Sequence, residues 1–160
     1  MSRLVTIQSF RYPKYVTVGK MIKGSNNFEL IMTEDVDKNN SVWIMTDPNE
    51  AGLSNFKNIV QDEVGNKEVF LARSRDTIQV DGKICYFSIG MTGGDGIDEN
   101  LKIKLFSKLI YSISFSSEKT YNMTVAKIYN HDILFVRNDS DQPVESNESL
   151  FVIEDYIAPM

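Results

Sequence analysis

The stretch Asn39-Asn40-Ser41-Val42-Trp43-Ile44-Met45 contains the only tryptophan of this 160-residue chain, and it decides the fold because similar stretches occur twice more. Asn147-Glu148-Ser149-Leu150-Phe151-Val152-Ile153 has the same order of polar and apolar residues, and Asp98-Glu99-Asn100-Leu101-Lys102-Ile103-Lys104 is a weaker copy. Each stretch is typical of a polar turn followed by a short apolar strand. We therefore expect a single domain, 1–160, made of three repeats at about residues 4–50, 51–108 and 109–160.

Alternation of apolar and polar residues with a period of two dominates the chain, whereas the spacing of an amphipathic helix is scarce. A short helical turn is the alternative to a strand at Ile59–Val60. The pair Asp81-Gly82 between two alternating runs predicts a tight hairpin. The pattern predicts strands at Leu4–Phe10, Tyr15–Val18, Phe28–Met32, Val42–Met45, Ile59–Val60, Glu68–Ala72, Thr77–Val80, Ile84–Ile89, Leu101–Phe106, Tyr111–Ser116, Met123–Ala126, Asp132–Arg137 and Leu150–Ile153.

Three units of short strands, none of which can bury its apolar face alone, predict an all-β protein with a closed threefold architecture. This pattern resembles the β-trefoil, a fold of three four-stranded repeats. A two-sheet β-sandwich has similar strand spacing and is the alternative. In the trefoil interpretation, Trp43, Lys102 and Phe151 are equivalent positions. We expect Trp43 and Phe151 to point into the core, and Lys102 to mark the divergent repeat.

The segment Gln8-Ser9-Phe10-Arg11-Tyr12-Pro13-Lys14-Tyr15-Val16 resembles the repeat opening of the arabinose-binding β-trefoil modules attached to arabinofuranosidases. In that family a serine is followed by an aromatic-proline pair and then by a tyrosine that enters the next strand. Ser9, Tyr12-Pro13 and Tyr15 match this order. The family continues with Arg-His where this chain has Thr17-Val18, and the other two repeats lack the aromatic-proline pair. Interleukin-1-like and fascin-like trefoils have related openings.

The resemblance implies a sugar site at Arg11, Tyr12, Lys14 and Tyr15. In such a site Tyr12 stacks on the apolar face of the sugar, while Arg11 and Lys14 donate hydrogen bonds to its hydroxyl groups. The alternative role of Tyr12 and Tyr15 is structural, because a tyrosine at a barrel rim buries its ring and leaves its hydroxyl in water.

The overall charge excludes some partners. A formal net charge of −5 argues against nucleic acid, whose phosphates require clustered Lys and Arg, and gives no reason to expect an anionic membrane.

No apolar run approaches the length that spans a bilayer, so we expect no membrane insertion. The first residues lack an apolar core of signal-peptide length, which predicts either a cytoplasmic chain or a secreted one that has lost its leader.

Few residues of this chain are suited to catalysis or to metal binding. Cys85 is the only cysteine, so no internal disulfide forms, and its apolar strand predicts a buried thiol. His131, the only histidine, follows Asn130 at an expected turn and is predicted to be exposed. Asp35–Asn40 begins like a calcium loop, but Asn40 and Thr46 replace the required Gly and Glu, which favours a solvated loop. We therefore predict no catalytic residue, no metal and no cofactor.

These observations predict a non-enzymatic binding protein, and two kinds of partner fit. The first is a glycan, bound by a lectin-like module through the Arg11–Tyr15 segment. The second is a protein, bound by a cytokine-like ligand or an inhibitor through long loops at Asp47–Asn58, Gly90–Asn100 and Asn138–Asn147. An enzyme is a distant third, because it requires Cys85 or a pair of carboxylates to be exposed in a cleft. The oligomeric state is left open.

Overall fold

The computed structural model describes residues 2–62, 65–80, 82–92, 100–115, 118–138 and 147–157. These residues form antiparallel strands and one short 3-10 helix, η1 (Asn147–Ser149). The strands are β1 (Arg3–Ser9), β2 (Tyr15–Met21), β3 (Phe28–Thr33), β4 (Val42–Met45), β5 (Phe56–Asp62), β6 (Gly65–Val80), β7 (Lys83–Met91), β8 (Leu101–Ser107), β9 (Ile110–Phe115), β10 (Glu118–Ile128), β11 (His131–Asn138) and β12 (Leu150–Asp155). No helix in this part of the chain has the length and apolar character needed to cross a membrane.

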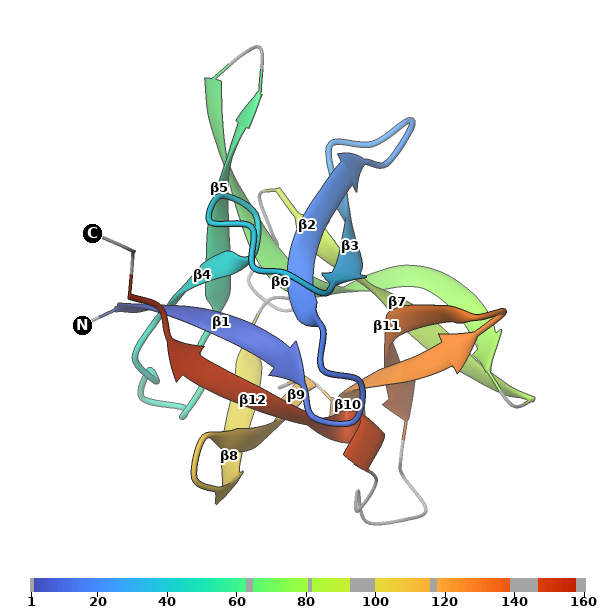
Figure 1. The fold of residues 1–160 in the computed structure, drawn as a ribbon. Coiled ribbons are helices and arrows are strands. Elements are labelled where there is room, and N and C mark those ends of the chain that lie inside the picture. Colours follow the sequence, from blue (N-terminus) through green and yellow to red (C-terminus); the bar gives the residue numbers. More distant parts are fainter. Residues whose placement is uncertain are drawn as a thin grey trace.

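Strand pairing closes the sheet into a barrel. Nine strands form a closed ring in which each strand is hydrogen-bonded to the next and the last to the first. Their order around the ring is β1, β4, β5, β6, β7, β11, β10, β9 and β12. The remaining three strands, β2, β3 and β8, pair with members of this ring. The first and last strands lie side by side and antiparallel, which brings the two ends of the chain near each other (Figure 1).

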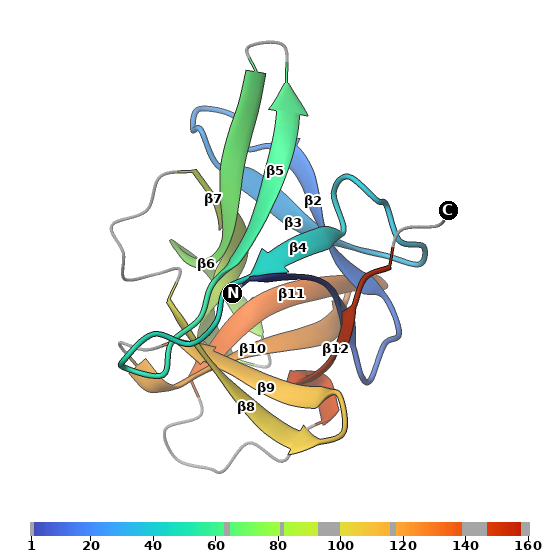
Figure 2. The same cartoon turned by 90° about the vertical axis from the view of Figure 1, so that its left-hand side faces the viewer.

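Successive strands form hairpins around this ring. The pairs β2–β3, β6–β7 and β10–β11 are each joined by an antiparallel ladder, which contains a register shift in the first two pairs. The end of the β5–β6 hairpin projects beyond the barrel in both views (Figures 1 and 2). A single bridge between Ser54 and Leu101, with N···O distances of 2.9 and 2.8 Å, connects the segment before β5 to β8.

The all-β prediction is confirmed, and the β-sandwich alternative is wrong because the sheet closes on itself. Every predicted strand lies within or overlaps an observed one. Ile59–Val60 belongs to a strand, not to a helical turn, and Val80 pairs with Lys83 as the predicted hairpin requires. Glu68–Ala72 and Thr77–Val80 are one strand, β6, which bends at a register shift between Arg73 and Thr77. Asp81 itself lies outside the described residues.

The core confirms two of the three positions predicted from the repeated stretch. The side chains of Trp43 and Phe151 are fully buried, and Trp43 Nε1 donates a hydrogen bond of 3.0 Å to the carbonyl oxygen of Val16. At the third position, expected to mark the divergent repeat, Lys102 is exposed, and the neighbouring Leu101 is the buried residue at the start of β8. The core face of β8 is therefore shifted by one residue from the predicted alignment.

Two buried hydroxyl pairs connect corresponding elements of the first and last thirds of the chain. Thr17 Oγ1 in β2 lies 2.8 Å from Ser41 Oγ, directly before β4. Thr124 Oγ1 in β10 lies 2.9 Å from Ser149 Oγ, directly before β12. In both of these repeated stretches, the serine directly before the apolar strand thus provides a hydrogen-bond partner for a buried threonine of the preceding hairpin.

Candidate functional site

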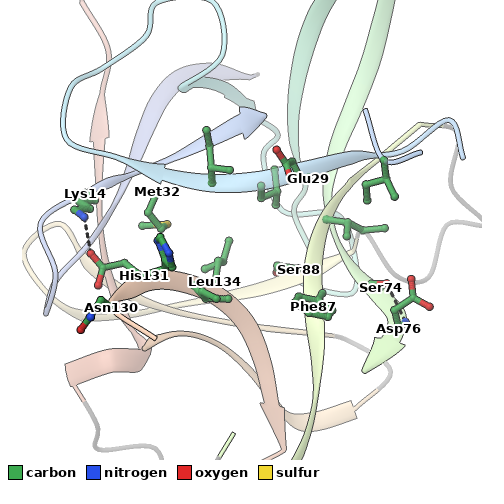
Figure 3. A pocket seen from close by; sticks show the side chains of 16 residues that line it. Lys14, Glu29, Met32, Ser74, Asp76, Phe87, Ser88, Asn130, His131 and Leu134 are labelled. Atoms are coloured by element: carbon green, nitrogen blue, oxygen red, sulfur yellow. Dashed lines mark hydrogen bonds and ion pairs between the residues drawn. The ribbon is translucent and has the colours of Figure 1, made fainter. Parts of the chain in front are cut away.

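A groove of about 580 Å³ opens between β3 and β11, with part of β7 along its floor (Figure 3). One edge of β7 pairs with β11 at Tyr86 and Phe87, and with β3 at Ile89 and Gly90. Its partner therefore changes at Ser88, and β3 and β11 diverge from this point. The groove is a direct result of that change of partner.

The middle of the groove is apolar. Met32 of β3, Phe87 of β7 and Leu134 of β11 line it, and Figure 3 shows Met32 and Leu134 between the two diverging strands. Met32 and Phe87 are partly exposed there, whereas Leu134 is buried. These side chains provide an apolar surface that water reaches only through the mouth of the groove.

One end of the groove carries a buried carboxylate. Asp132, the second residue of β11, forms an ion pair with Lys14, with 2.7 Å between Asp132 Oδ2 and Lys14 Nζ. The side chain of Asp132 is only 5% exposed. Its second oxygen, Oδ1, is buried and has no hydrogen-bond partner among the described residues. The hydrogen bond to Asp132, together with the negative charges of Asp132 and Glu34, raises the pKa of Lys14 above 10.5 despite partial desolvation. Asn130 and His131 line the same end.

Ser88 is a second buried polar group that the protein leaves unsatisfied. The residue is 4% exposed, lines the groove, and its Oγ has no hydrogen-bond partner in the described part of the chain. Buried polar atoms are almost always hydrogen-bonded, since an unpaired one costs about 1–3 kcal/mol. Two such atoms, Asp132 Oδ1 and Ser88 Oγ, belong to residues that line one groove, and neither has a protein partner among the described residues.

The opposite end of the groove lies at the bend of β6. Ser74 and Asp76 line it within the register shift, and Asp76 N donates a 3.0 Å hydrogen bond to Ser74 Oγ. Glu29 of β3 also borders the groove, but its side chain covers Gly19 of β2, and its Oε1 accepts a 3.3 Å hydrogen bond from Lys20 N. The carboxylate of Glu29 is therefore engaged on the far side of β3.

The structure separates the four predicted sugar-binding residues. Lys14 lines the groove through its ion pair with Asp132. Tyr12 packs partly buried against the core, with the cations of Arg11 and Lys127 at 5.7 and 5.9 Å from its ring centroid. Tyr15 begins β2, is partly buried, and pairs with Gln8 and Thr33. Only Lys14 of the four borders this groove, and Arg11 is exposed outside it.

The segment Ser9–Lys14 has a structural role that the sequence did not reveal. Ser9 Oγ accepts a hydrogen bond from Tyr12 N, and Ser9 N donates to Lys14 O, so the turn is closed on itself. The contact of Lys127 with Tyr12 and the ion pair of Lys14 with Asp132 attach this turn to the β10–β11 hairpin. The serine-aromatic order thus shapes one end of the groove. Ser88 and Asp132 are not part of a recognisable sequence motif. They line the same groove only because β3 and β11 diverge beside β7.

The structure also shows the positions of the cysteine, the histidine and the calcium-like loop noted in the sequence. Cys85 is buried, as predicted, and His131 is exposed at the start of β11, also as predicted. Asp37 Oδ1 accepts hydrogen bonds from Asn39 N and Asn40 N, so this carboxylate caps the loop predicted to be solvated. Within the described ranges, no group of three or more His, Cys, Asp or Glu side chains is arranged to hold a metal ion.

Of the three loops predicted to bind a protein, one lies entirely within the described residues. In Asp47–Asn58, Asn49 Oδ1 accepts hydrogen bonds from Ala51 N and Leu53 N, which orders the turn. Residues 93–99 and 139–146, the centres of the other two loops, lie outside the described residues. Protein binding through these loops stays a prediction.

Comparison with known proteins places the chain by fold alone. No protein family matches its sequence, and no curated protein does. It is similar in structure to a salivary protein from Culex quinquefasciatus of the cysteine and tryptophan-rich family, with a TM-score of 0.67 and 12% identity over 98% of this chain and 95% of that one. It is also similar to ThreeFoil, a designed threefold symmetric protein, with a TM-score of 0.68 and 12% identity over 96% and 99% of the two chains.

These findings correct the resemblance drawn from Ser9–Val16. That segment led to the β-trefoil superfamily, through arabinose-binding, interleukin-1-like and fascin-like members, and this assignment is wrong. The similar structures are instead a salivary protein and a designed one. The physical reason is that a short serine-aromatic-proline turn is stabilised by its own hydrogen bonds, as it is here, and so does not require membership of that superfamily. With one cysteine and one tryptophan, the chain also lacks the composition that names the salivary family.

Proposed function

We propose that this protein is a non-enzymatic carbohydrate-binding protein and that the groove between β3 and β11 is its sugar site. The observation that carries the proposal is the pair of buried, unsatisfied polar atoms, Asp132 Oδ1 and Ser88 Oγ, beside an apolar surface. A site built to hydrogen-bond a ligand leaves such atoms unpaired when the ligand is absent.

The chemistry of the groove matches that of a sugar ring. A pyranose has an apolar C–H face and a rim of hydroxyl groups that donate and accept hydrogen bonds. Met32, Phe87 and Leu134 offer an apolar surface to the face, while Asp132 accepts from hydroxyl groups and Ser88 both donates and accepts. The volume of about 580 Å³ falls within the usual range for small-molecule sites, which is roughly 300–1,000 Å³.

The charges of the groove favour a neutral sugar over an anionic one. Lys14, the only lysine or arginine among the described residues that line it, is already paired with Asp132, while Asp76 adds an exposed negative charge at the other end. A phosphate or carboxylate ligand gains little from a cation that is already neutralised, and Asp132 repels it. We therefore expect affinity for neutral mono- or disaccharides and weaker affinity for their acidic derivatives.

The arrangement of the groove supports binding without catalysis. Ser88 Oγ has no base within hydrogen-bond distance among the described residues, so nothing activates it as a nucleophile. Asp132 is held as an ion pair by Lys14, and Cys85 is buried away from solvent. Ser88 and Asp132 are therefore suited to positioning a ligand by hydrogen bonding.

We also propose that the barrel is arranged as a β-trefoil, with three four-stranded repeats at about 4–50, 51–108 and 109–160. Three hairpins of similar position and the matched hydroxyl pairs Thr17–Ser41 and Thr124–Ser149 support this arrangement. The likeness to a designed threefold symmetric protein supports it as well. The proposal concerns the path of the chain only.

Calorimetric titration with a panel of neutral and acidic sugars tests the sugar site. Ser88→Ala is the most informative variant, because it removes an unpaired buried hydroxyl and should leave the melting temperature unchanged or higher. Its affinity for the bound sugar should nevertheless fall by about tenfold, the equivalent of about 1.4 kcal/mol for one lost hydrogen bond. Asp132→Asn should weaken binding at least as much, since a charged acceptor becomes a neutral one.

Ser112→Ala is the matched control, because Ser112 is a buried serine of β9 outside the groove. It should bind the sugar like the unmodified protein. The proposal fails if no sugar in the panel binds, or if Ser88→Ala and Ser112→Ala bind equally well. A merely structural role for Ser88 would lower stability in Ser88→Ala and leave affinity unchanged.

A further inference from the structure

The tip of the β8–β9 hairpin exposes three large apolar side chains close together in sequence. Leu105, Phe106 and Leu109 are 59, 52 and 49% exposed. They lie at or next to the two-residue turn Lys108-Leu109, which joins Ser107 to Ile110. In Figure 2 this hairpin lies at the lower edge of the molecule. Exposed apolar residues that cluster in this way indicate an interaction surface.

The apolar tip is surrounded by positive charge. Lys102, Lys104 and Lys108 are all exposed, and residues 101–115 contain no aspartate or glutamate. The nearest acidic residues on the adjoining strand β12 are Glu154 and Asp155, and Asp155 is paired with Arg3 at 3.3 Å. A local excess of cations in a chain of net charge −5 means that this surface differs from the rest of the molecule.

Leu109 is held in a conformation that a leucine rarely adopts. Its φ of 58° lies in the left-handed region, where Gly and Asn are the usual residues of a turn. About half of the Leu109 side chain is exposed, so packing accounts for only part of its surface. Such an outlier points to a function for the side chain itself.

A simpler role explains part of this pattern but not all of it. Among the described residues, β8 pairs with β9 on one side and makes only the Ser54–Leu101 bridge on the other, so they leave most of that edge unpaired. Lysines on an open edge prevent strand addition, which accounts for Lys102 and Lys104. Edge protection does not require an apolar cluster at the tip or a leucine in the left-handed region, and both work against solubility.

We propose that the β8–β9 tip, defined as residues 104–109, docks this protein on the surface of an anionic membrane. Leu105, Phe106 and Leu109 enter the boundary between head groups and acyl chains, and the surrounding lysines contact lipid phosphates. The docking is peripheral and involves no span. It departs from the expectation based on net charge, because that expectation averages over the whole chain, whereas residues 101–115 carry three lysines and no aspartate or glutamate.

Co-sedimentation with phosphatidylcholine vesicles, with and without phosphatidylserine, tests this proposal. The protein should bind the vesicles that contain phosphatidylserine and bind less as salt is raised. Binding should fall by about tenfold or more in the double variant Phe106→Ser/Leu109→Ser and in Lys104→Glu/Lys108→Glu. Leu109→Gly should weaken binding while keeping or raising the melting temperature, because glycine relieves the left-handed backbone.

Matched controls come from other exposed residues. Ile84→Ser removes an exposed isoleucine of β7, and Lys23→Glu/Lys38→Glu reverses two exposed lysines far along the chain from the tip. Both should bind like the unmodified protein. Equal binding to neutral vesicles, equal loss in the controls, or no vesicle binding at all would overturn the proposal. If the tip variants instead abolish self-association in sedimentation velocity, the surface serves contact between copies and not a membrane.

Discussion

At the scale of single residues, the ion pair of Lys14 and Asp132 connects the turn after β1 to the start of β11. The carboxylate is almost fully buried and lies 2.7 Å from Lys14 Nζ, and removing one partner of a buried ion pair is destabilising. The other oxygen of this carboxylate, Oδ1, is buried and has no partner among the described residues. One ion pair therefore both fixes the turn and presents an acceptor to a ligand.

The raised pKa of Lys14 predicts how this ion pair depends on pH. Since its folded-state pKa lies above the ordinary 10.5, the stabilisation is fully present below pH 10.5 and is lost as pH rises through the folded-state value. The difference in free energy of unfolding between the protein and Lys14→Gln should be constant from neutral pH to 10.5 and shrink above it. Urea unfolding followed by the fluorescence of buried Trp43 measures this difference.

Lys23→Gln, which removes an exposed lysine, is the control and should show no such dependence. A difference between the protein and Lys14→Gln that persists unchanged at about pH 12 would show that packing of the lysine stem, and not its charge, stabilises the turn.

Residues in regular strands were predicted well, and residues at irregular points were not. The burial of Trp43, Phe151 and Cys85 follows from apolar strands whose inward face alternation identifies. Lys102 was aligned with them by sequence similarity alone, and the core position turned out to be Leu101, since one step along a strand reverses its face. Ser88 was missed because a serine in an alternating strand gives no signal that its neighbours separate.

At the scale of elements, each of two corresponding hairpins is linked to the strand that closes its segment by a buried pair of hydroxyl groups. Thr17 of β2 meets Ser41 before β4, and Thr124 of β10 meets Ser149 before β12. Thr17 Oγ1 also lies 2.8 Å from Thr33 Oγ1 in β3. These contacts explain why the repeated stretch begins with a polar residue directly before its apolar strand.

Replacing either threonine by valine should destabilise the fold to a similar degree. Thr17→Val and Thr124→Val keep the shape of the side chain but leave a buried serine without this partner, at a cost of about 1–3 kcal/mol each. Urea unfolding provides the measurement. Thr77→Val, at an exposed position of β6, is the control and should change stability by less than about 0.5 kcal/mol. Loss of stability in one variant only would mean that the two repeats are not equivalent.

The alternation of apolar and polar residues predicted a strand at each of the strands observed among the described residues. It did not predict the points at which a strand stops pairing with one neighbouring strand and begins to pair with another. Val42–Met45 was predicted with the observed bounds, because turn residues delimit it on both sides. The bend in β6 was instead read as a gap between two strands, since residues 73–77 break the alternation without ending the hydrogen-bonded ladder. Bulges of this kind are a result of pairing between distant strands, and local sequence does not encode them.

At the scale of the whole molecule, closing the barrel produces the groove. The strand β7 must pair with β11 along one part of its edge and with β3 along the next, so these two strands cannot pair with each other at that point. The turn Ser9–Lys14 and the bend of β6 then delimit its two ends. The closed ring was predictable from the repeats, whereas the groove depends on the registers of three distant strands.

The most direct test of the sugar site is the mapping of backbone amide shifts by two-dimensional NMR during titration with a neutral disaccharide that binds. If the groove is the site, the amides of Ser88, Asp132 and Leu134 should shift together and saturably, while those of Tyr12 and of residues 47–53 should not move. Shifts confined to Tyr12 and Tyr15, or to residues 47–53, would contradict the account, because the ligand would then bind outside the space between β3 and β11.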